Sequence, residues 1–193
     1  RELNIEKGLM TLVDEDMIYK INSLANISSG HKSCGGSAGN TMIALAQLGA
    51  KSFYSCKVAD DENGRFFLSE ILRTGLETNL SKRLYEGETG QCLVFVTPDA
   101  ERTMNTHLGI TESFSEEEID WEALKKSELL YVEGYLVTSN SGRSAATKAL
   151  DFAKKNGLQT VLTFSDPSMP TYFRDGLIEM IGGNKLDLLF CNR

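Results

Sequence analysis

Most of this chain alternates between stretches with the hydrophobic period of a helix and short apolar runs typical of buried strands. Apolar residues three and four positions apart predict helices over residues 37–48 and 65–74, each followed by a glycine that suits a helix end, Gly49 and Gly75. The same patterns predict further helices over 14–24, 115–127, 142–156 and 172–181, and strands over 9–13, 51–59, 128–137, 159–165 and 185–192. This alternation implies an α/β fold, a parallel sheet with helices on both faces.

Residues 78–110 differ, because they show strand and turn patterns without a helical one. "QCLVFVTP" (91–98) reads as an apolar strand, "PDAE" (98–101) as a turn, and "RTMNTHLG" (102–109) as the partner strand of a hairpin. We therefore expect an α/β body in two parts, residues 1–77 and 111–193, interrupted at 78–110 by a separate small β-sheet that could form a flap.

Composition and charge narrow the class of protein. A formal net charge of −7 argues against nucleic acid or a membrane surface as a partner, although a few local donors could still hold an anionic ligand. No run is apolar enough to span a bilayer, and "RELNIEKGLM" does not resemble a signal peptide. Two histidines and four well-separated cysteines (Cys34, Cys56, Cys92 and Cys191) argue against zinc and indicate reduced core thiols in a cytoplasmic protein.

The two ends of the chain suggest a fragment of a longer protein. The chain does not begin with Met, and "KLDLLFCNR" (185–193) reads as a buried strand at its very end. A core strand normally leads to something that covers it, so we expect further sequence around these residues.

Polar residues follow three of the predicted body strands. In open α/β sheets, ligands bind beyond the carboxyl ends of the strands. That rule selects "EGY" (133–135), "SDPS" (165–168) and "CNR" (191–193), hence Glu133, Asp166 and Asn192. Any single strand end runs into a polar loop, but three together favour one shared pocket.

A glycine-rich stretch, "SCGGSAGNT" (33–41), stands where the helix at 37–48 begins. It is neither a Walker A loop nor G-x-G-x-x-G. A helix start offers free N–H groups, and the Asn40 amide both donates and accepts hydrogen bonds, which suits sugar hydroxyls. The alternative is that these small residues only let the helix pack closely on the sheet.

Four segments resemble the ribokinase-like, or pfkB, family of carbohydrate and nucleoside kinases: "GGSAGNTMIALAQLG", "KVADDENGRFF", "TGQCLVFVTPDAERTMNTHLG" and "LDLLFCNR". They occur in the family's order and cover its N-terminal and central part. The lid segment is most similar to bacterial adenosine-kinase-like and sugar kinases. The resemblance implies a Rossmann-like domain with a β-sheet lid, and Mg²⁺-assisted transfer of the ATP γ-phosphoryl group to a hydroxymethyl of a sugar or nucleoside.

The resemblance also implies roles for particular residues. Gly35 and Gly36 would form the hinge between lid and body, Asn40 would contact substrate hydroxyls, and Asn192 would begin a motif that organises Mg²⁺ and phosphate through water. We expect no direct metal ligand in this chain. The substrate-binding candidates are Gly35, Gly36, Ser37, Asn40, Arg102 and Glu133, and the candidates near phosphate and metal are Asp166 and Asn192.

The departures from the family pattern limit what this chain alone can do. The family's catalytic Asp, in a Gly-Ala-Gly-Asp type motif, does not occur here, and neither does the substrate-binding Asp of the first strand. We therefore expect a kinase whose isolated 193 residues are inactive. The alternatives are a non-catalytic small-molecule-binding module, or a domain whose glycines serve only packing. A homodimer formed through the lid is left open.

Overall fold

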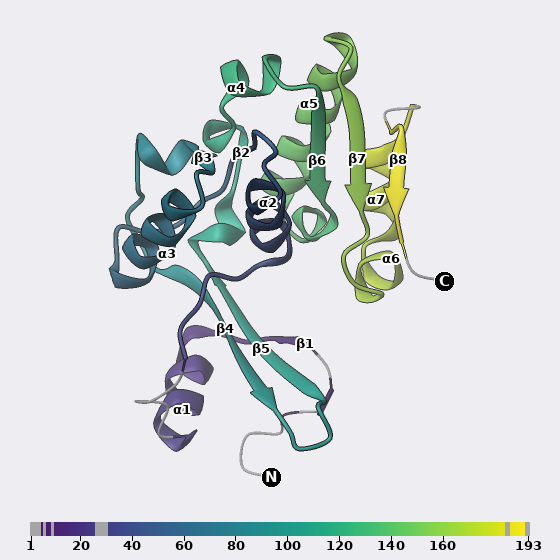
Figure 1. The fold of residues 1–193 in the computed structure, drawn as a ribbon. Helices are drawn as coiled ribbons and strands as arrows, with labels where there is room; N and C mark the ends of the chain where they lie inside the picture. Colours follow the sequence, from purple (N-terminus) through teal and green to yellow (C-terminus); the bar gives the residue numbers. More distant parts are fainter. Residues whose placement is uncertain (1–4, 6, 9, 26–30, 184–185, 192–193) are drawn as a thin grey trace.

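The computed structural model describes residues 5, 7–8, 10–25, 31–183 and 186–191, and it shows an α/β body with a smaller lobe beside it (Figure 1). The smaller lobe holds β1, β4, β5 and α1, and the remaining strands and helices form the body. The strands β6, β7 and β8 point their carboxyl ends toward the smaller lobe (Figure 1).

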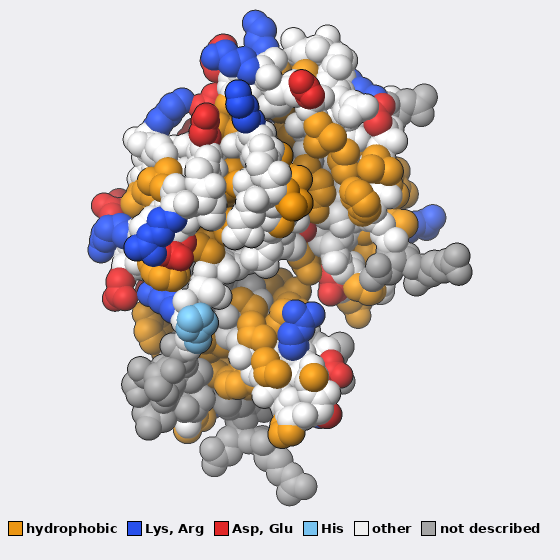
Figure 2. All heavy atoms as spheres, viewed as in Figure 1, with side chains coloured by type: hydrophobic (Ala, Val, Ile, Leu, Met, Phe, Trp, Pro, Cys, Tyr) orange, Lys and Arg blue, Asp and Glu red, His pale blue; other side chains and the backbone are white. Residues whose placement is uncertain are grey.

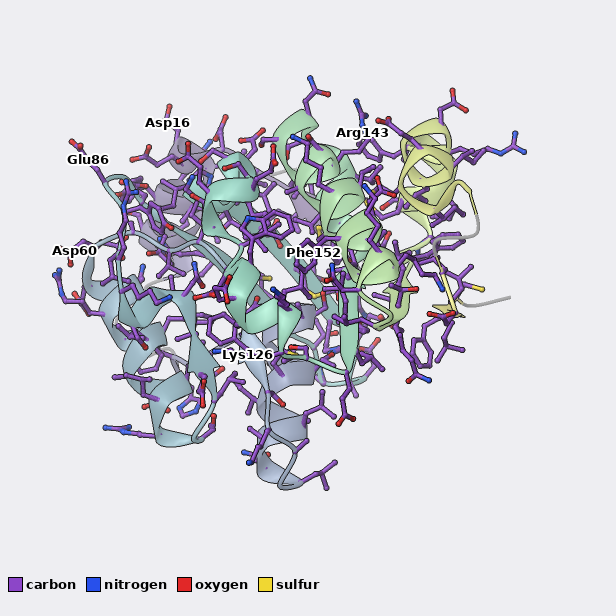
Figure 3. All side chains as sticks on the ribbon, turned by 90° about the horizontal axis from the view of Figure 1, so that it is seen from above. Asp16, Asp60, Glu86, Lys126, Arg143 and Phe152 are labelled. Atoms are coloured by element: carbon purple, nitrogen blue, oxygen red, sulfur yellow. The ribbon has the colours of Figure 1, made fainter. Side chains whose placement is uncertain are left out.

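The sheet of the body is parallel, in the order β6 (Leu129–Glu133), β7 (Gln159–Thr163) and β8 (Leu188–Phe190). Helices α5 (Asn140–Lys155) and α7 (Arg174–Ile181) lie on one side of it, and α2 (Ser37–Gln47) lies on the other, where it contacts β6 (Figures 1 and 3). The expected parallel sheet with helices on both faces is confirmed.

The core of the body forms where α5 and α7 meet the sheet. Leu150, Leu162 and Met180 have no exposed surface there, and in a neighbouring cluster Phe152 of α5 (labelled in Figure 3) packs against Trp121 with the two rings tilted by 57° and their centroids 5.2 Å apart. Each such buried side chain stabilises the fold by about 1.5–3 kcal/mol. The edge strand β8 is less protected, since Leu188 and Phe190 are about half exposed.

A second, two-stranded parallel sheet joins β2 (Phe53–Tyr54) to β3 (Glu77–Thr78) beside α3 (Glu62–Arg73). The strand predicted over 51–59 is therefore much shorter. A side chain replaces the neighbouring strand after Tyr54: Asn79 accepts from the Cys56 N–H at 3.0 Å and donates to the Cys56 carbonyl at 2.8 Å. Periodicity in the sequence does not reveal such a substitution.

The sheet of the smaller lobe has the order β1-β5-β4. The predicted hairpin is present, with β4 (Thr89–Val96) antiparallel to β5 (Arg102–Gly109), and β1 (Met10–Leu12) lies parallel to β5. We call this three-stranded sheet the lid. Helix α1 (Glu15–Ala25) packs on β5, and Asp14 caps it by accepting from the Met17 N–H at 2.8 Å.

The lid does not coincide with the predicted segment 78–110. Its strand β1 comes from the part assigned to the body, while Thr78 lies in the two-stranded sheet β2-β3 of the body and the 3₁₀ helix Asn79–Ser81 follows it. A three-residue strand can pair with any free edge of a sheet. Met10 of β1 pairs with Met104 of β5, which is far away in the sequence. The local pattern therefore predicts the strand but not the sheet that it joins.

Two other predicted elements are divided in the structure. The helix expected over 115–127 becomes a 3₁₀ helix, Glu116–Glu118, followed by α4 (Trp121–Lys125), since Asp120 caps a new helix by accepting from the Ala123 N–H at 2.9 Å. The strand expected over 128–137 ends at Glu133, where a Cβ on Gly134 would lie 2.4 Å from the Thr163 carbonyl oxygen.

Shorter elements complete the described chain. They are the 3₁₀ helices Ile110–Ser113 and Gly134–Thr138 and the helix α6 (Ser168–Tyr172). The cysteines were expected to be core residues, and Cys56 is buried, but Cys92 and Cys191 are exposed. Cys92 lies on the outward-facing side of the alternating strand β4, and Cys191 follows the edge strand β8.

Candidate functional site

The carboxyl ends of β6 and β7 meet at one polar position. Glu133 and Thr163 are register partners there, and Ser165 donates a hydrogen bond from Oγ to Glu133 Oε1 at 3.3 Å. The other oxygen, Glu133 Oε2, is buried and has no donor in good hydrogen-bonding geometry, although the Tyr131 hydroxyl lies near the same carboxylate. A buried carboxylate oxygen without a donor is costly, so this atom marks a place where a ligand hydroxyl would be stabilising.

Ser165 adopts a backbone conformation that is uncommon for a residue with a side chain. Its φ is +66°, in the left-handed region, at a cost of about 1–3 kcal/mol. Such strain is typical of ligand sites, where the surrounding structure holds one geometry. Here the geometry directs the hydroxyl of Ser165 at Glu133.

Two tyrosines line the same end of the sheet. Burial raises the pKa of Tyr131 to about 12, and the charge of Glu133 and a side-chain hydrogen-bonding interaction with it add to the effect, while the hydroxyls of Thr41 and Thr163 oppose it. Burial likewise raises the pKa of Tyr135 to about 12, with further contributions from Asp166, Glu133 and Cys92. Both hydroxyls therefore stay protonated at neutral pH and can donate hydrogen bonds to a ligand.

These interactions bring three segments together. Thr41, directly after Asn40 in α2, lies near Tyr131 on β6, so the helix start adjoins the Glu133 carboxylate. The carboxyl ends of the strands point toward the lid (Figure 1), and Cys92 on β4 is near enough to Tyr135 for its charge to add to the raised pKa of that tyrosine. The strand ends, the glycine-rich helix start and the lid thus border one region.

Asp166 lies in the loop after β7 and is engaged locally. Its Oδ1 accepts hydrogen bonds from the Ser168 N–H at 2.8 Å and from the Ser168 hydroxyl at 2.5 Å. These bonds organise the turn that leads into α6. The contribution of Asp166 to the pKa of Tyr135 places it beside the strand ends.

The glycine-rich stretch divides into a packed part and an open part. Gly39 is buried against Tyr54 and Phe67, whose atoms lie 3.8 Å from where a Cβ would stand, an ordinary contact distance. A Cβ on Gly35 or Gly36 would meet no atom within 4 Å, and Gly36 has a φ of +85°. Packing therefore does not account for Gly35 and Gly36.

The remaining candidates lie at different distances from the strand ends. Ser37 and Asn40 are exposed on the first turns of α2, where no side chain caps the helix. Arg102 is exposed at the far end of the lid hairpin, opposite Val96. Asn192 lies outside the described residues. Sequence reasoning missed Tyr131, although its position two residues before Glu133 on one strand was a usable signal.

The part of the chain that the structure describes contains no group of three His, Cys, Asp or Glu side chains that could hold a metal ion. No helix within the described ranges is long and apolar enough to cross a membrane.

An α/β body, polar strand ends and a small lid sheet beside a glycine-rich helix start define a two-lobed α/β protein. Residues 10–193 match the family described as pfkB family carbohydrate kinase, and the chain belongs to that family.

Relatives and solved structures agree with this assignment. The chain is 31% identical over 144 residues to a 5-dehydro-2-deoxygluconokinase of Clostridium beijerinckii, which covers 73% of the chain and 42% of the relative. It superposes on an adenosine kinase from Sinorhizobium meliloti with a TM-score of 0.87 and 31% identity, and on a probable sugar kinase from Rhizobium etli with 0.90 and 28%. Both superpositions cover 100% of this chain and 58% of the solved chain.

The chain thus spans less than half of the curated relative and somewhat more than half of the matched structures. Kinases related to it act on sugars and nucleosides, and kinases of this family use ATP with a divalent metal in general.

Proposed function

We propose that this chain is the acceptor-binding portion of an ATP-dependent kinase that phosphorylates a hydroxymethyl group of a sugar or ribonucleoside. The observation that supports it most is Glu133 Oε2, buried and without a hydrogen-bond donor where the strand ends, α2 and the lid converge. A substrate hydroxyl would supply the donor that this carboxylate lacks.

In this proposal the start of α2 holds the other side of the sugar. The Asn40 amide donates to one hydroxyl and accepts from another, and the uncapped N–H groups after Gly36 donate to oxygen atoms of the substrate. Each such hydrogen bond contributes about 0.5–1.5 kcal/mol, so several are needed for useful affinity.

The exposed face of the lid favours a nucleoside over a bare sugar. Cys92, Val94 and Val96 alternate onto one face of β4, where Val94 is 49% and Val96 68% exposed. Hydrophobic side chains gather over β4 and β5 on the side seen in Figure 2. The strand ends point toward the lid (Figure 1), and in this proposal closure of the lid buries this apolar face against a nucleobase.

ATP and Mg²⁺ would act at the same end of the sheet. Mg²⁺ supplies charge neutralisation at the transferring phosphoryl group. The family resemblance assigns Asp166 and Asn192 to the phosphate and metal side, where they would act through water rather than as direct ligands, and Asn192 lies outside the described residues. The catalytic Asp belongs to a motif that this sequence does not contain. The 193 residues alone are therefore inactive in this proposal, and the phosphoryl transfer is assigned to the longer protein in the cytoplasm.

The test is to incubate the full-length protein with ATP, Mg²⁺ and a panel of nucleosides and sugars, and to follow ADP. Substrate-dependent ADP release is expected, with a nucleoside as the preferred acceptor. Binding of a sugar or nucleoside without ADP release would instead support the non-catalytic module. Sedimentation with and without the acceptor tests whether two copies pair through the lid.

A further inference from the structure

A single carboxylate connects the base of the lid to the body. Asp61 precedes α3, and its Oδ1 caps that helix by accepting from the Gly64 N–H at 2.6 Å. The same oxygen accepts from the Thr89 hydroxyl at 2.7 Å, and Oδ2 accepts from the Thr89 N–H at 2.8 Å. Thr89 is the first residue of β4 and is only 6% exposed.

The hydroxyl of Thr89 also accepts a hydrogen bond from the Ala59 N–H at 2.9 Å, so both of its hydrogen-bonding functions are used. Burial acts to raise the pKa of Asp61, but the hydrogen bonds from Thr89 and Gly64 outweigh it and the pKa is lowered. The carboxylate is therefore ionised at neutral pH, and its hydrogen bonds are of the stronger, charge-assisted kind.

The junction around these groups leaves no room for a side chain at three glycines. A Cβ on Gly64 would lie 1.9 Å from the Ala59 carbonyl oxygen, and one on Gly90 would lie 2.5 Å from the Leu108 carbonyl oxygen. Gly109, the partner of Thr89 across the hairpin, has a φ of +53° and would bring a Cβ within 2.3 Å of the Glu88 carbonyl oxygen. The hairpin base is thus closely packed on both strands.

The connection between lid and body that runs from α1 to α2 is loosely packed, unlike the base of the hairpin. The chain passes from α1 to α2 through Gly35 and Gly36, where a Cβ would meet nothing within 4 Å. One connection is held by hydrogen bonds and packing, and the other is free to absorb changes in φ and ψ.

We propose that Asp61 is a positioning residue: through Thr89 it fixes the base of the β4–β5 hairpin, so that the lid closes on the strand ends in one register. This rests on the proposed function, since it describes how the acceptor site is closed. Asp61 touches neither substrate nor ATP, and its effect reaches the site through the hairpin that carries Cys92 and Val94.

The test compares variants of the full-length protein. Thr89→Val keeps the shape but removes the hydroxyl, and Thr89→Ser restores it. Asp61→Ser keeps a residue that caps α3 while removing the carboxylate that reaches Thr89. The matched control is Asp120→Ser, since Asp120 caps α4 in the same way with Oδ1 but binds Lys82 rather than the lid with Oδ2.

Thr89→Val and Asp61→Ser should each lower kcat/KM for the acceptor by about tenfold, the effect of losing a hydrogen bond to a charged group. The KM for ATP should not change, Thr89→Ser should behave like the wild type, and Asp120→Ser should keep its kcat/KM. If Asp61 had a purely structural role, Asp61→Ser and Asp120→Ser would both lower the melting temperature, and kcat/KM for the acceptor would not distinguish them. Equal kcat/KM for Asp61→Ser and Asp120→Ser would overturn the proposal.

Native-state hydrogen exchange gives a second measurement that does not need activity. Amides of β4 and β5 should exchange faster in Thr89→Val than in the wild type, and they should be unchanged in Asp120→Ser. Unchanged exchange in Thr89→Val would contradict the proposal, even if Asp61→Ser does not fold. If the wild type releases no ADP with any acceptor, the proposed function fails, while the exchange experiment still decides whether Asp61 fixes the hairpin.

Discussion

The Ser165 hydroxyl donates a hydrogen bond to Glu133 Oε1 at 3.3 Å, and this bond joins the ends of two neighbouring parallel strands. It holds one oxygen of the carboxylate and leaves the other, Oε2, buried and without a donor. The strained backbone of Ser165 makes this arrangement specific. In the proposed function, a substrate hydroxyl donates a hydrogen bond to this second oxygen.

Replacing Glu133 tests that carboxylate directly. Glu133→Gln keeps the size of the side chain and an acceptor for Ser165 but removes the charge, so acceptor binding should weaken by about 1.5–3 kcal/mol. Isothermal titration calorimetry with the preferred acceptor measures the change. The control is Glu128→Gln, an exposed residue just before the other end of β6, which should bind normally. Unchanged affinity in Glu133→Gln would exclude this residue from the acceptor site.

Asn40→Ala should weaken acceptor binding by about 1 kcal/mol for each hydrogen bond lost. The melting temperature should hardly move, because Asn40 is exposed on α2. Asn156→Ala is the matched control, since Asn156 is an exposed asparagine whose amide donates to the Phe152 carbonyl at 2.8 Å and should affect stability only. A large fall in melting temperature with normal binding would make Asn40 a structural residue.

Gly36→Val tests the hinge, and α2 supplies its control. Gly36 and Gly49 stand at opposite ends of the helix with φ of +85° and +87°, and neither would place a Cβ within 4 Å of another atom. Valine at either position should cost of order 1–3 kcal/mol of stability through backbone strain. Only Gly36→Val should also lower kcat/KM for the acceptor, and normal turnover in that variant would remove the hinge proposal.

A buried ion pair makes a prediction about stability. Lys57 Nζ lies 3.0 Å from Glu118 Oε1, with the two side chains 14% and 1% exposed. Glu118 also accepts from the Ser115 N–H at 2.6 Å. Glu118→Gln leaves the Lys57 charge buried without its partner and should destabilise by about 3–5 kcal/mol in chemical denaturation. Glu116→Gln, which breaks the exposed pair with Lys148, should cost at most about 1 kcal/mol. Equal effects would contradict this account.

The pH dependence of stability should reveal Asp187. A hydrogen bond from Lys154, then those from the Thr160 N–H and hydroxyl, lower the pKa of Asp187 from 3.8 to about 2. A lowered pKa gives stability that is present above the ordinary value and is lost as the pH falls from 3.8 to about 2. Asp187→Asn should therefore melt below the wild type at neutral pH and equal it near pH 2. A difference independent of pH would show that charge is not involved.

The sequence alone determined most of the helices and the class of fold. Helices α2, α3 and α5 each show a helical period of hydrophobic residues. Glycines follow the first two helices, and lysines stand in the last turn of α5. These features are local in the sequence and do not depend on contacts with distant residues. The apolar runs of β6 and β7 required burial on both faces, which only a covered parallel sheet provides. The polar types at the strand ends, Glu133 and Asp166 among them, were equally visible.

The tertiary structure decided which of these residues meet. The pairing of Met10 with Met104, the replacement of a strand by the Asn79 amide and the hydrogen bonds between Asp61 and Thr89 all join distant parts of the chain. Such contacts follow from how the elements pack, because a hydrogen bond between distant residues depends on the path of everything between them. Hydrophobic period is a property of neighbours along the chain, and it contains no information about that path.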